Sequence, residues 1–152
     1  LPLAGAAATE AEAPADAAAI GAPTLRLLLV DDNLDALDVL AEWFALEGHD
    51  VRKAGSAEEA LQLLEAGPVD AGIFDIGLPG MSGHELARRV RERERESGTR
   101  RIALLALTGY GQESDRRQAL EAGFDAHFSK PADLGKLREA LRQLTDDAPV
   151  TA

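Results

Sequence analysis

Three aspartates stand directly after apolar segments of the sequence, where they could act together. The segment LRLLLV ends at Asp31 and Asp32, and the segment AGIF ends at Asp75. Glycine and proline follow Asp75 within four residues, a pattern that ends a strand and opens a loop. In an open parallel sheet, the loops beyond the carboxyl ends of the strands form the reactive crevice, so carboxylates placed there are available to a ligand. A strand-terminal aspartate can also serve only to form the next turn, and Asp75 alone does not separate these roles.

A hydroxyl and a lysine end two further apolar segments, at Thr108 and Lys130. Three carboxylates close together repel one another unless a cation joins them, and oxygen ligands without histidine or cysteine favour a hard ion. Few protein ligands and several waters suit Mg²⁺ better than Ca²⁺. A lysine charge and a hydroxyl suit the oxygens of a phosphoryl group, and an aspartate can accept that group as a nucleophile. The residues therefore predict a metal-assisted carboxylate site that handles phosphoryl groups.

The segments around these residues predict strands that alternate with helices. Five helices are predicted, four of them carry apolar stripes at helical spacing, and one of these opens with a capping box at residues 56–59. Between Arg88 and Glu96 arginine alternates with glutamate, which predicts a solvated helix face crossed by ion pairs rather than a basic patch. Strands are predicted at residues 25–30, 50–54, 71–75, 102–107 and 126–129. This α/β alternation with short loops predicts a doubly wound five-stranded parallel sheet with helices on both faces.

The chain of 152 residues has the length and the 45% apolar content of one compact domain. Residues 1–24 hold eleven alanines, three prolines and no basic residue, and are predicted to form a linker or tail. The folded domain is predicted at residues 25–145. Residues 146–152 are predicted to be a disordered tail.

Charge and composition exclude several classes of partner. The formal net charge of -11 argues against binding to nucleic acid or to an anionic membrane surface. The absence of cysteine excludes disulfides, zinc thiolates and thiol catalysis, and is typical of a reducing compartment. No apolar run approaches the roughly eighteen residues of a membrane span, and no signal peptide pattern is present. We therefore expect a cytoplasmic protein.

From about Leu25 to Leu144 the chain resembles the receiver domains of two-component response regulators. The matching motifs are LLLVDDN, FDIGLPGMSG, ALTGYG and the Lys-Pro pair after GFDAHFS. The resemblance implies a flavodoxin-like (βα)5 fold with strand order 2-1-3-4-5. It also implies a role in phosphorelay signalling, in which the domain takes a phosphoryl group from a phosphohistidine and changes conformation.

The resemblance implies a role for each acid. Asp75 would be the phosphoacceptor, Asp32 a direct ligand of Mg²⁺ or Mn²⁺, and Asp31 a ligand acting largely through water. Gly77 would add its backbone carbonyl.

The resemblance also implies the parts of a switch. Lys130 would pair with the phosphoryl oxygens, and Thr108 would move in to hydrogen-bond them. The peptide bond between Lys130 and Pro131 is expected to be cis, as is common in the family. The family's aromatic switch position is His127 here, which implies either an altered switch, mildly pH-dependent, or an ordinary half-exposed strand residue.

The lifetime of the phosphoryl group depends in this family on the positions held here by Gly77 and Tyr110. Neither side chain is an amide or acid suited to orient an attacking water, so we expect a long-lived phosphoryl group.

The resemblance leaves the context of the domain open. Residues 1–4 resemble the closing strand of a histidine-kinase ATP-binding domain, and the chain begins with Leu1 instead of methionine, so we expect the carboxy-terminal receiver of a hybrid histidine kinase. A free-standing single-domain regulator or a phosphate sink is the alternative. The expected partners are the phosphohistidine domain of a kinase, a histidine phosphotransfer protein, or both, and a homodimer could form through the fifth strand and last helix. The domain alone is not expected to be an enzyme, although it assists its own phosphorylation and dephosphorylation.

Three other classes fit the residues less well. A haloacid dehalogenase phosphatase needs an acid two residues after its nucleophile, where this chain has Gly77. A flavodoxin needs a phosphate cradle after the first strand, where Asp31 and Asp32 would repel phosphate in the absence of a metal. A degenerate receiver that only docks to other proteins usually lacks one of the site residues, and all of them are present.

Overall fold

The computed structural model describes residues 24–109 and 113–151, in which five strands alternate with five helices. The elements are β1 (Arg26–Val30), α2 (Leu34–Leu46), β2 (Asp50–Ala54), α3 (Ala57–Ala66), β3 (Ala71–Asp75), α4 (Gly83–Ser97), β4 (Ala103–Thr108), α5 (Glu113–Ala122), β5 (Ala126–Ser129) and α6 (Leu134–Thr151). The linker predicted at the amino terminus lies outside the described residues, except for Thr24.

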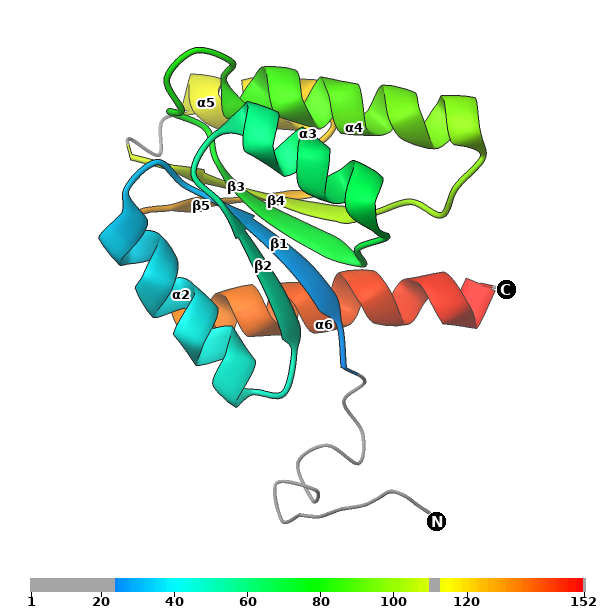
Figure 1. The fold of residues 1–152 in the computed structure, drawn as a ribbon, viewed down its shortest axis with the longest axis horizontal. Helices are drawn as coiled ribbons and strands as arrows, with labels where there is room; N and C mark the ends of the chain where they lie inside the picture. Colours follow the sequence, from blue (N-terminus) through cyan, green and yellow to red (C-terminus); the bar gives the residue numbers. More distant parts are fainter. Residues whose placement is uncertain (1–23, 110–112, 152) are drawn as a thin grey trace.

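The strands form one parallel sheet in the order β2-β1-β3-β4-β5, with α3, α4 and α5 on one face and α2 and α6 on the other (Figure 1). This arrangement confirms the flavodoxin-like fold and the expected strand order. Because all strands run the same way, their carboxyl ends lie along one edge of the sheet. The residues that follow those ends are therefore brought together by the topology alone.

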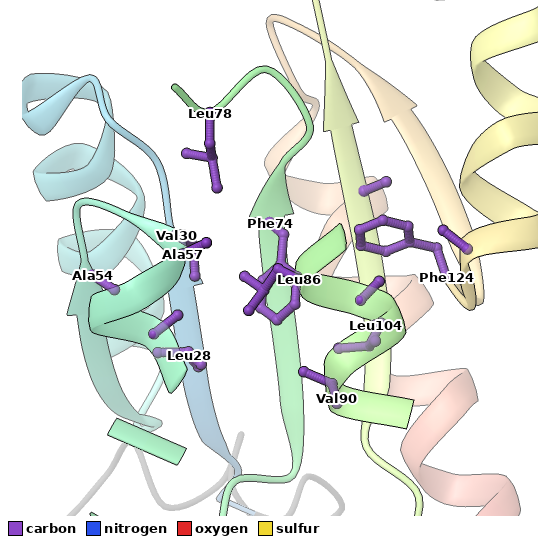
Figure 2. Close-up of a cluster of buried hydrophobic side chains, with 14 of the residues drawn as sticks. Leu28, Val30, Ala54, Ala57, Phe74, Leu78, Leu86, Val90, Leu104 and Phe124 are labelled. Atoms are coloured by element: carbon purple, nitrogen blue, oxygen red, sulfur yellow. The ribbon is translucent and has the colours of Figure 1, made fainter. Parts of the chain in front are cut away.

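A hydrophobic layer covers each face of the sheet. Leu28, Phe74 and Leu104 point toward α3, α4 and α5, where Leu86 packs between them (Figure 2). The alternate strand residues point the other way, toward α2 and α6. Nearly all the strand side chains of β1, β3 and β4 are buried, and each large apolar side chain so buried contributes about 1.5–3 kcal/mol. The sheet is thus a rigid support for the loops at its edge.

Short polar side chains cap four helices, and at α6 Asp133 accepts the N–H of Lys136 (3.2 Å). Asn33 accepts a hydrogen bond from the Ala36 N–H (3.1 Å), and Ser82 accepts one from the Glu85 N–H (3.2 Å). Ser56 accepts the N–H of Glu59 (3.1 Å), as the capping box predicted. The Glu59 carboxylate accepts the N–H of Gly55 (2.8 Å) rather than that of Ser56. These caps occupy backbone donors that the first helical turn leaves unpaired.

Two strands begin one residue later than predicted. The N–H of Leu25 donates to Nδ1 of His49 (3.1 Å), and β1 begins at the next residue. The N–H of Ile102 donates to the Glu94 carboxylate (2.7 Å), and β4 begins after it. At its other end β4 includes Thr108, which pairs with Ser129 of β5.

The last helix, α6, runs from Leu134 to Thr151, and the disordered tail at residues 146–152 stays a prediction. Between Gly135 and Pro149 no glycine or proline interrupts this helix, and the stripe of leucines packs on the sheet. The helix therefore continues beyond the last leucine of its stripe. Among the described residues, no helix is long and apolar enough to cross a membrane.

Arg91 of α4 is buried near the amino-terminal edge of the sheet, although the alternation of arginine and glutamate predicted a solvated face. Its guanidinium donates to the carboxylates of Glu94 (2.9 Å) and Asp125 (3.0 Å). It also donates to the backbone carbonyls of Gly123 (2.9 Å) and Ile102 (2.8 Å). Arg91 therefore connects α4 to the segments that lead into β4 and β5.

Candidate metal and phosphoryl site

The predicted site residues meet at the carboxyl edge of the sheet. Backbone hydrogen bonds continue past the strand ends and hold the first residues of the loops in place. The Asp31 N–H donates to the Ala54 carbonyl (3.1 Å), and the Lys130 N–H donates to the Thr108 carbonyl (2.7 Å). The chain is thereby fixed up to the residues that carry the polar side chains.

Three carboxylates form the centre of this edge. Asp31, Asp32 and Asp75 each place one oxygen atom within 4.8 Å of the others. Asp31 and Asp75 are buried, whereas Asp32 is exposed. The acidic cluster is therefore closed on the protein side and accessible from solvent.

Lys130 lies between the two buried acids. Its Nζ is 3.0 Å from Oδ2 of Asp31 and 3.4 Å from Oδ2 of Asp75. The other oxygen of each acid accepts a backbone hydrogen bond from two residues further on. Asp31 accepts the N–H of Asn33 (2.9 Å), and Asp75 accepts the N–H of Gly77 (3.1 Å). The positions of both carboxylates are thus set by the loops that follow them.

Burial raises the pKa of Asp75, and the neighbouring charge of Asp31 raises it further. The Gly77 N–H and Lys130 oppose this change without cancelling it. Burial alone would lower the pKa of Lys130, but its hydrogen bond to Asp31 and the charges of Asp75 and Asp31 outweigh that effect and raise it. Lys130 is therefore held as a cation, and Asp75 ionises less readily than a carboxyl group in water.

The charges of the cluster do not balance without a cation. Ionised, the three carboxylates carry three negative charges, and Lys130 supplies one positive charge. The donor atoms are all oxygen, which hard divalent ions prefer. A divalent cation would neutralise the two remaining charges, so the residues of this edge fit a metal ion of the Mg²⁺ type.

The remaining predicted residues that the structure describes lie on β4, on β5 and directly after β5. Thr108 is buried at the end of β4, and the Lys130–Pro131 peptide bond is cis, as expected. His127 lies in β5 opposite Ala106, on the sheet face that α5 covers. Its Nε2 atom is buried and has no hydrogen-bond partner among the described residues. Tyr110 lies outside the described residues.

Two residues that support the site were not predicted to do so. Asn33 both caps α2 and donates its N–H to Asp31. Gly83 packs so closely on the end of β3 that a Cβ atom there would lie 2.5 Å from the Asp75 carbonyl oxygen. The sequence holds a signal for each, since an asparagine precedes an apolar stripe and a glycine follows Pro79 and Gly80. Neither signal identifies the contact that the residue makes.

The comparison with known families identifies the class of protein to which this fold belongs. The family model described as the response regulator receiver domain matches residues 27–142. The chain therefore belongs to the response regulator receiver domain family.

Related proteins differ in their overall length. The chain is 38% identical over 117 residues to an uncharacterized 14.6 kDa protein of Leptolyngbya boryana, which covers 77% of this chain and 87% of that protein. It is 36% identical over 121 residues to the aerobic respiration control protein ArcA of Escherichia coli, covering 80% of this chain and 48% of ArcA. It is 35% identical over 138 residues to the virulence sensor protein BvgS of Bordetella pertussis, covering 86% of this chain but 11% of BvgS. The chain thus spans about half of ArcA and a small part of BvgS.

One similar solved structure contains a receiver domain together with another protein. It is the co-crystal structure of the histidine phosphotransfer protein Ypd1 of Saccharomyces cerevisiae with the receiver domain of Ssk1. The match has a TM-score of 0.76 and 25% identity, and covers 81% of this chain and 90% of the matched chain.

Proposed function

We propose that this domain accepts a phosphoryl group from a phosphohistidine onto Asp75 in two-component or phosphorelay signalling. The observation that carries this proposal is the position of the Asp75 carboxylate. It lies at the carboxyl edge of the sheet, between the Gly77 N–H and the Lys130 ammonium, with Asp31 and Asp32 beside it. A nucleophile, a phosphate-binding cation and a metal-binding acid pair are thus within reach of one another.

In the proposed transfer, an Asp75 oxygen attacks the phosphorus of the donor. A P–O bond forms while the P–N bond to the donor imidazole breaks, and the imidazole keeps the electron pair and takes a proton from solvent. Lys130 holds the phosphoryl oxygens by charge, which requires it to exchange part of its contact with Asp31 and Asp75 for the new group.

Mg²⁺, with Mn²⁺ as the alternative ion, is the proposed cofactor. Asp32 and Asp75 would hold it through their carboxylate oxygens, Asp31 would hold it largely through water, and Gly77 would add its backbone carbonyl. When bound, the ion reduces the repulsion between the phosphoryl oxygens and the acids that surround them.

Thr108 and His127 are the proposed switch residues. Thr108 stands at the end of β4, where its hydroxyl can turn toward a phosphoryl group on the neighbouring strand end. His127 lies on the next strand with a buried nitrogen that lacks a partner among the described residues. A movement that gives this nitrogen a partner would be favourable, which supports a second conformation.

The context that we propose is the receiver of a hybrid histidine kinase in the cytoplasm, with residues 1–24 as its linker. The likeness to the sensor protein BvgS supports this context. The proposed partners are a kinase phosphohistidine domain, a histidine phosphotransfer protein, or both, and the domain itself is not proposed to be an enzyme beyond assisting its own phosphorylation and dephosphorylation.

The test is the intact mass of the protein after incubation with acetyl phosphate and Mg²⁺. We expect one added phosphoryl group, which EDTA and the variant Asp75→Asn should both remove. Asp70→Asn is the matched control, because Asp70 precedes the same strand at the opposite edge of the sheet and should not affect labelling. If folded wild-type protein gains no mass, or if Asp75→Asn is still labelled, the proposed function is wrong.

A further inference from the structure

Asn33 is bonded both to an acid of the site and to the helix that follows it. Its backbone N–H donates to Oδ1 of Asp31 (2.9 Å), and its side-chain Oδ1 accepts the N–H of Ala36 (3.1 Å). Its backbone carbonyl accepts the N–H of Leu37 (3.0 Å). Three polar groups of one residue therefore connect Asp31 to the first turn of α2.

The body of α2 gives this connection a firm support. Leu37, Ala41 and Phe44 are buried on the side of the helix that packs on the sheet. From the carboxyl edge of the sheet, α2 runs back along its face (Figure 1). The first turn depends on the cap more than the rest of the helix does, because its backbone donors have no partner within the helix. The position of Asn33 therefore depends on whether this first turn is formed.

Asp31 is held from two sides. Its Oδ1 accepts the Asn33 N–H, and its Oδ2 lies 3.0 Å from Nζ of Lys130. The side chain is buried, so its orientation is set by protein groups more than by water. Fraying of the first turn of α2 would move the Asn33 N–H and remove one of the two contacts that fix this carboxylate.

A formed first turn and a bound cation favour the same state of Asp31. An ion in the acidic cluster needs the Asp31 carboxylate in one orientation, whether it contacts that carboxylate directly or through water. By linkage, each event then favours the other by the same factor. The cost of losing an asparagine cap corresponds to a factor of roughly two to thirty in the equilibrium between a formed and a frayed turn, which sets the scale of the coupling.

We propose that Asn33 is a positioning residue for the metal site: through its cap on α2 it sets the orientation of Asp31, so that Mg²⁺ binding and formation of the first turn of α2 favour each other. The inference rests on the proposed function, because it takes the acidic cluster to be a Mg²⁺ site. It adds a residue outside that cluster, and a connection from the site to α2.

Ser56 provides a matched control, because it caps a helix whose preceding strand, β2, carries no residue of the acidic cluster. Its Oγ accepts the N–H of Glu59 (3.1 Å), and its backbone carbonyl accepts the N–H of Ala60 (3.1 Å). The helix α3 thus begins with the same two bonds as α2. Loss of either cap should lower the Tm by a similar amount, but only loss of the Asn33 cap should affect the metal site.

Titration calorimetry with Mg²⁺ alone measures the first consequence. Asn33→Ala should raise the Kd for Mg²⁺ by about threefold or more, because the cap no longer fixes the turn that holds Asp31. Asn33→Ser keeps a capping oxygen and should stay within about twofold of wild type. Ser56→Ala should also stay within about twofold, although it loses a cap of the same kind.

Hydrogen exchange followed by NMR measures the reciprocal effect and needs no phosphoryl donor. Saturating Mg²⁺ should slow exchange of the Ala36 and Leu37 amides by about threefold or more, because the ion stabilises the turn that protects them. The amides of Glu59 and Ala60 should exchange at the same rate with and without Mg²⁺. In Asn33→Ala the effect of Mg²⁺ on Leu37 should be lost.

The inference is overturned if Asn33→Ala binds Mg²⁺ as tightly as wild type, or if Ser56→Ala weakens binding to the same extent. It is also overturned if Mg²⁺ leaves the exchange of Ala36 and Leu37 unchanged. If wild-type protein binds no Mg²⁺, both the proposed cofactor and this inference are wrong. If Mg²⁺ binds with the expected coupling but acetyl phosphate does not label Asp75, the proposed function is wrong and the role of Asn33 stands.

Discussion

Replacement of Arg91 by methionine tests how far the scaffold depends on one buried charge. The side chain of Arg91 is 8% exposed, and Glu94 and Asp125 beside it are 10% and 15% exposed. Methionine keeps the apolar stem but removes every hydrogen bond of the guanidinium. Two carboxylates and two carbonyl oxygens would then lose a donor in a region that water reaches poorly.

The loss of stability depends on which hydrogen bonds each carboxylate keeps after the guanidinium is removed. Loss of one partner from a buried ion pair costs about 3–5 kcal/mol. Here Glu94 keeps the N–H of Ile102, and Asp125 keeps the N–H of Leu104 and the guanidinium of Arg101. We therefore expect the lower end, about 3 kcal/mol, which corresponds to a fall in Tm of about 6–12 °C for a chain of this size.

Urea unfolding followed by circular dichroism measures this loss. The matched control is Arg93→Met on the same helix, because Arg93 makes a single ion pair with Glu65 at 3.6 Å and both side chains are exposed. The control should lose less than about 1 kcal/mol. Folded Arg91→Met should still accept a phosphoryl group from acetyl phosphate, because Arg91 lies near the opposite edge of the sheet from Asp75.

If Arg91→Met and Arg93→Met have the same free energy of unfolding, the reasoning is refuted. The cost of burying the guanidinium would then equal the value of its contacts, and Arg91 would not stabilise the fold.

The remaining predictions concern the site and the packing around it. Asp75→Asn should raise the Tm of the metal-free protein, because it removes a buried charge next to Asp31. The pKa of Asp75 is raised in the folded state, so its negative charge destabilises the fold only where the carboxyl group is ionised in the unfolded chain. The gain in Tm should therefore be absent below about pH 3.9 and grow as the pH rises toward 7. A flat difference in Tm across that range would contradict it. Mg²⁺ should stabilise wild-type protein by about 1.4 kcal/mol at ten times its Kd, and calorimetry should show a much smaller effect in Asp32→Asn; equal stabilisation of both proteins would exclude Asp32 as a ligand. The phosphoryl group on Asp75 should persist in buffer for longer than seconds, and a wild-type half-life of seconds would refute the role given to Gly77 and Tyr110. Gly77→Asn should shorten this lifetime in a time course of intact mass. The site has room for the new side chain, because a Cβ at residue 77 meets only Oδ1 of Asp75, at 3.8 Å. Gly123→Ala should lower the Tm, because φ is +117° and the new Cβ would lie 2.8 Å from Cγ of Arg91; an unchanged melting curve would show that the loop relaxes freely.

The misplaced expectation for Arg91 shows where reading the sequence by charge alone fails. Leu86, Ala87 and Val90 define the buried side of α4, and Arg91 lies four residues after Ala87 on the same side. Periodicity thus places Arg91 in the buried stripe, whereas alternation with glutamate suggests solvent. Burial prevails because two carboxylates and two carbonyls surround the guanidinium, and those groups come from the segments before β4 and β5 as well as from α4.

The sequence by itself determined the alternation of strands and helices and the set of residues at the carboxyl edge of the sheet. Apolar periodicity is a local property of the sequence, so it predicts the elements. Once the strands are parallel, Asp31, Asp75, Thr108 and Lys130 lie at the same edge of the sheet whatever the exact pairing of the strands. Only the tertiary structure decided how these side chains meet. Lys130 contacts Asp31 and Asp75 across 99 and 55 residues of chain, a distance that no local pattern records.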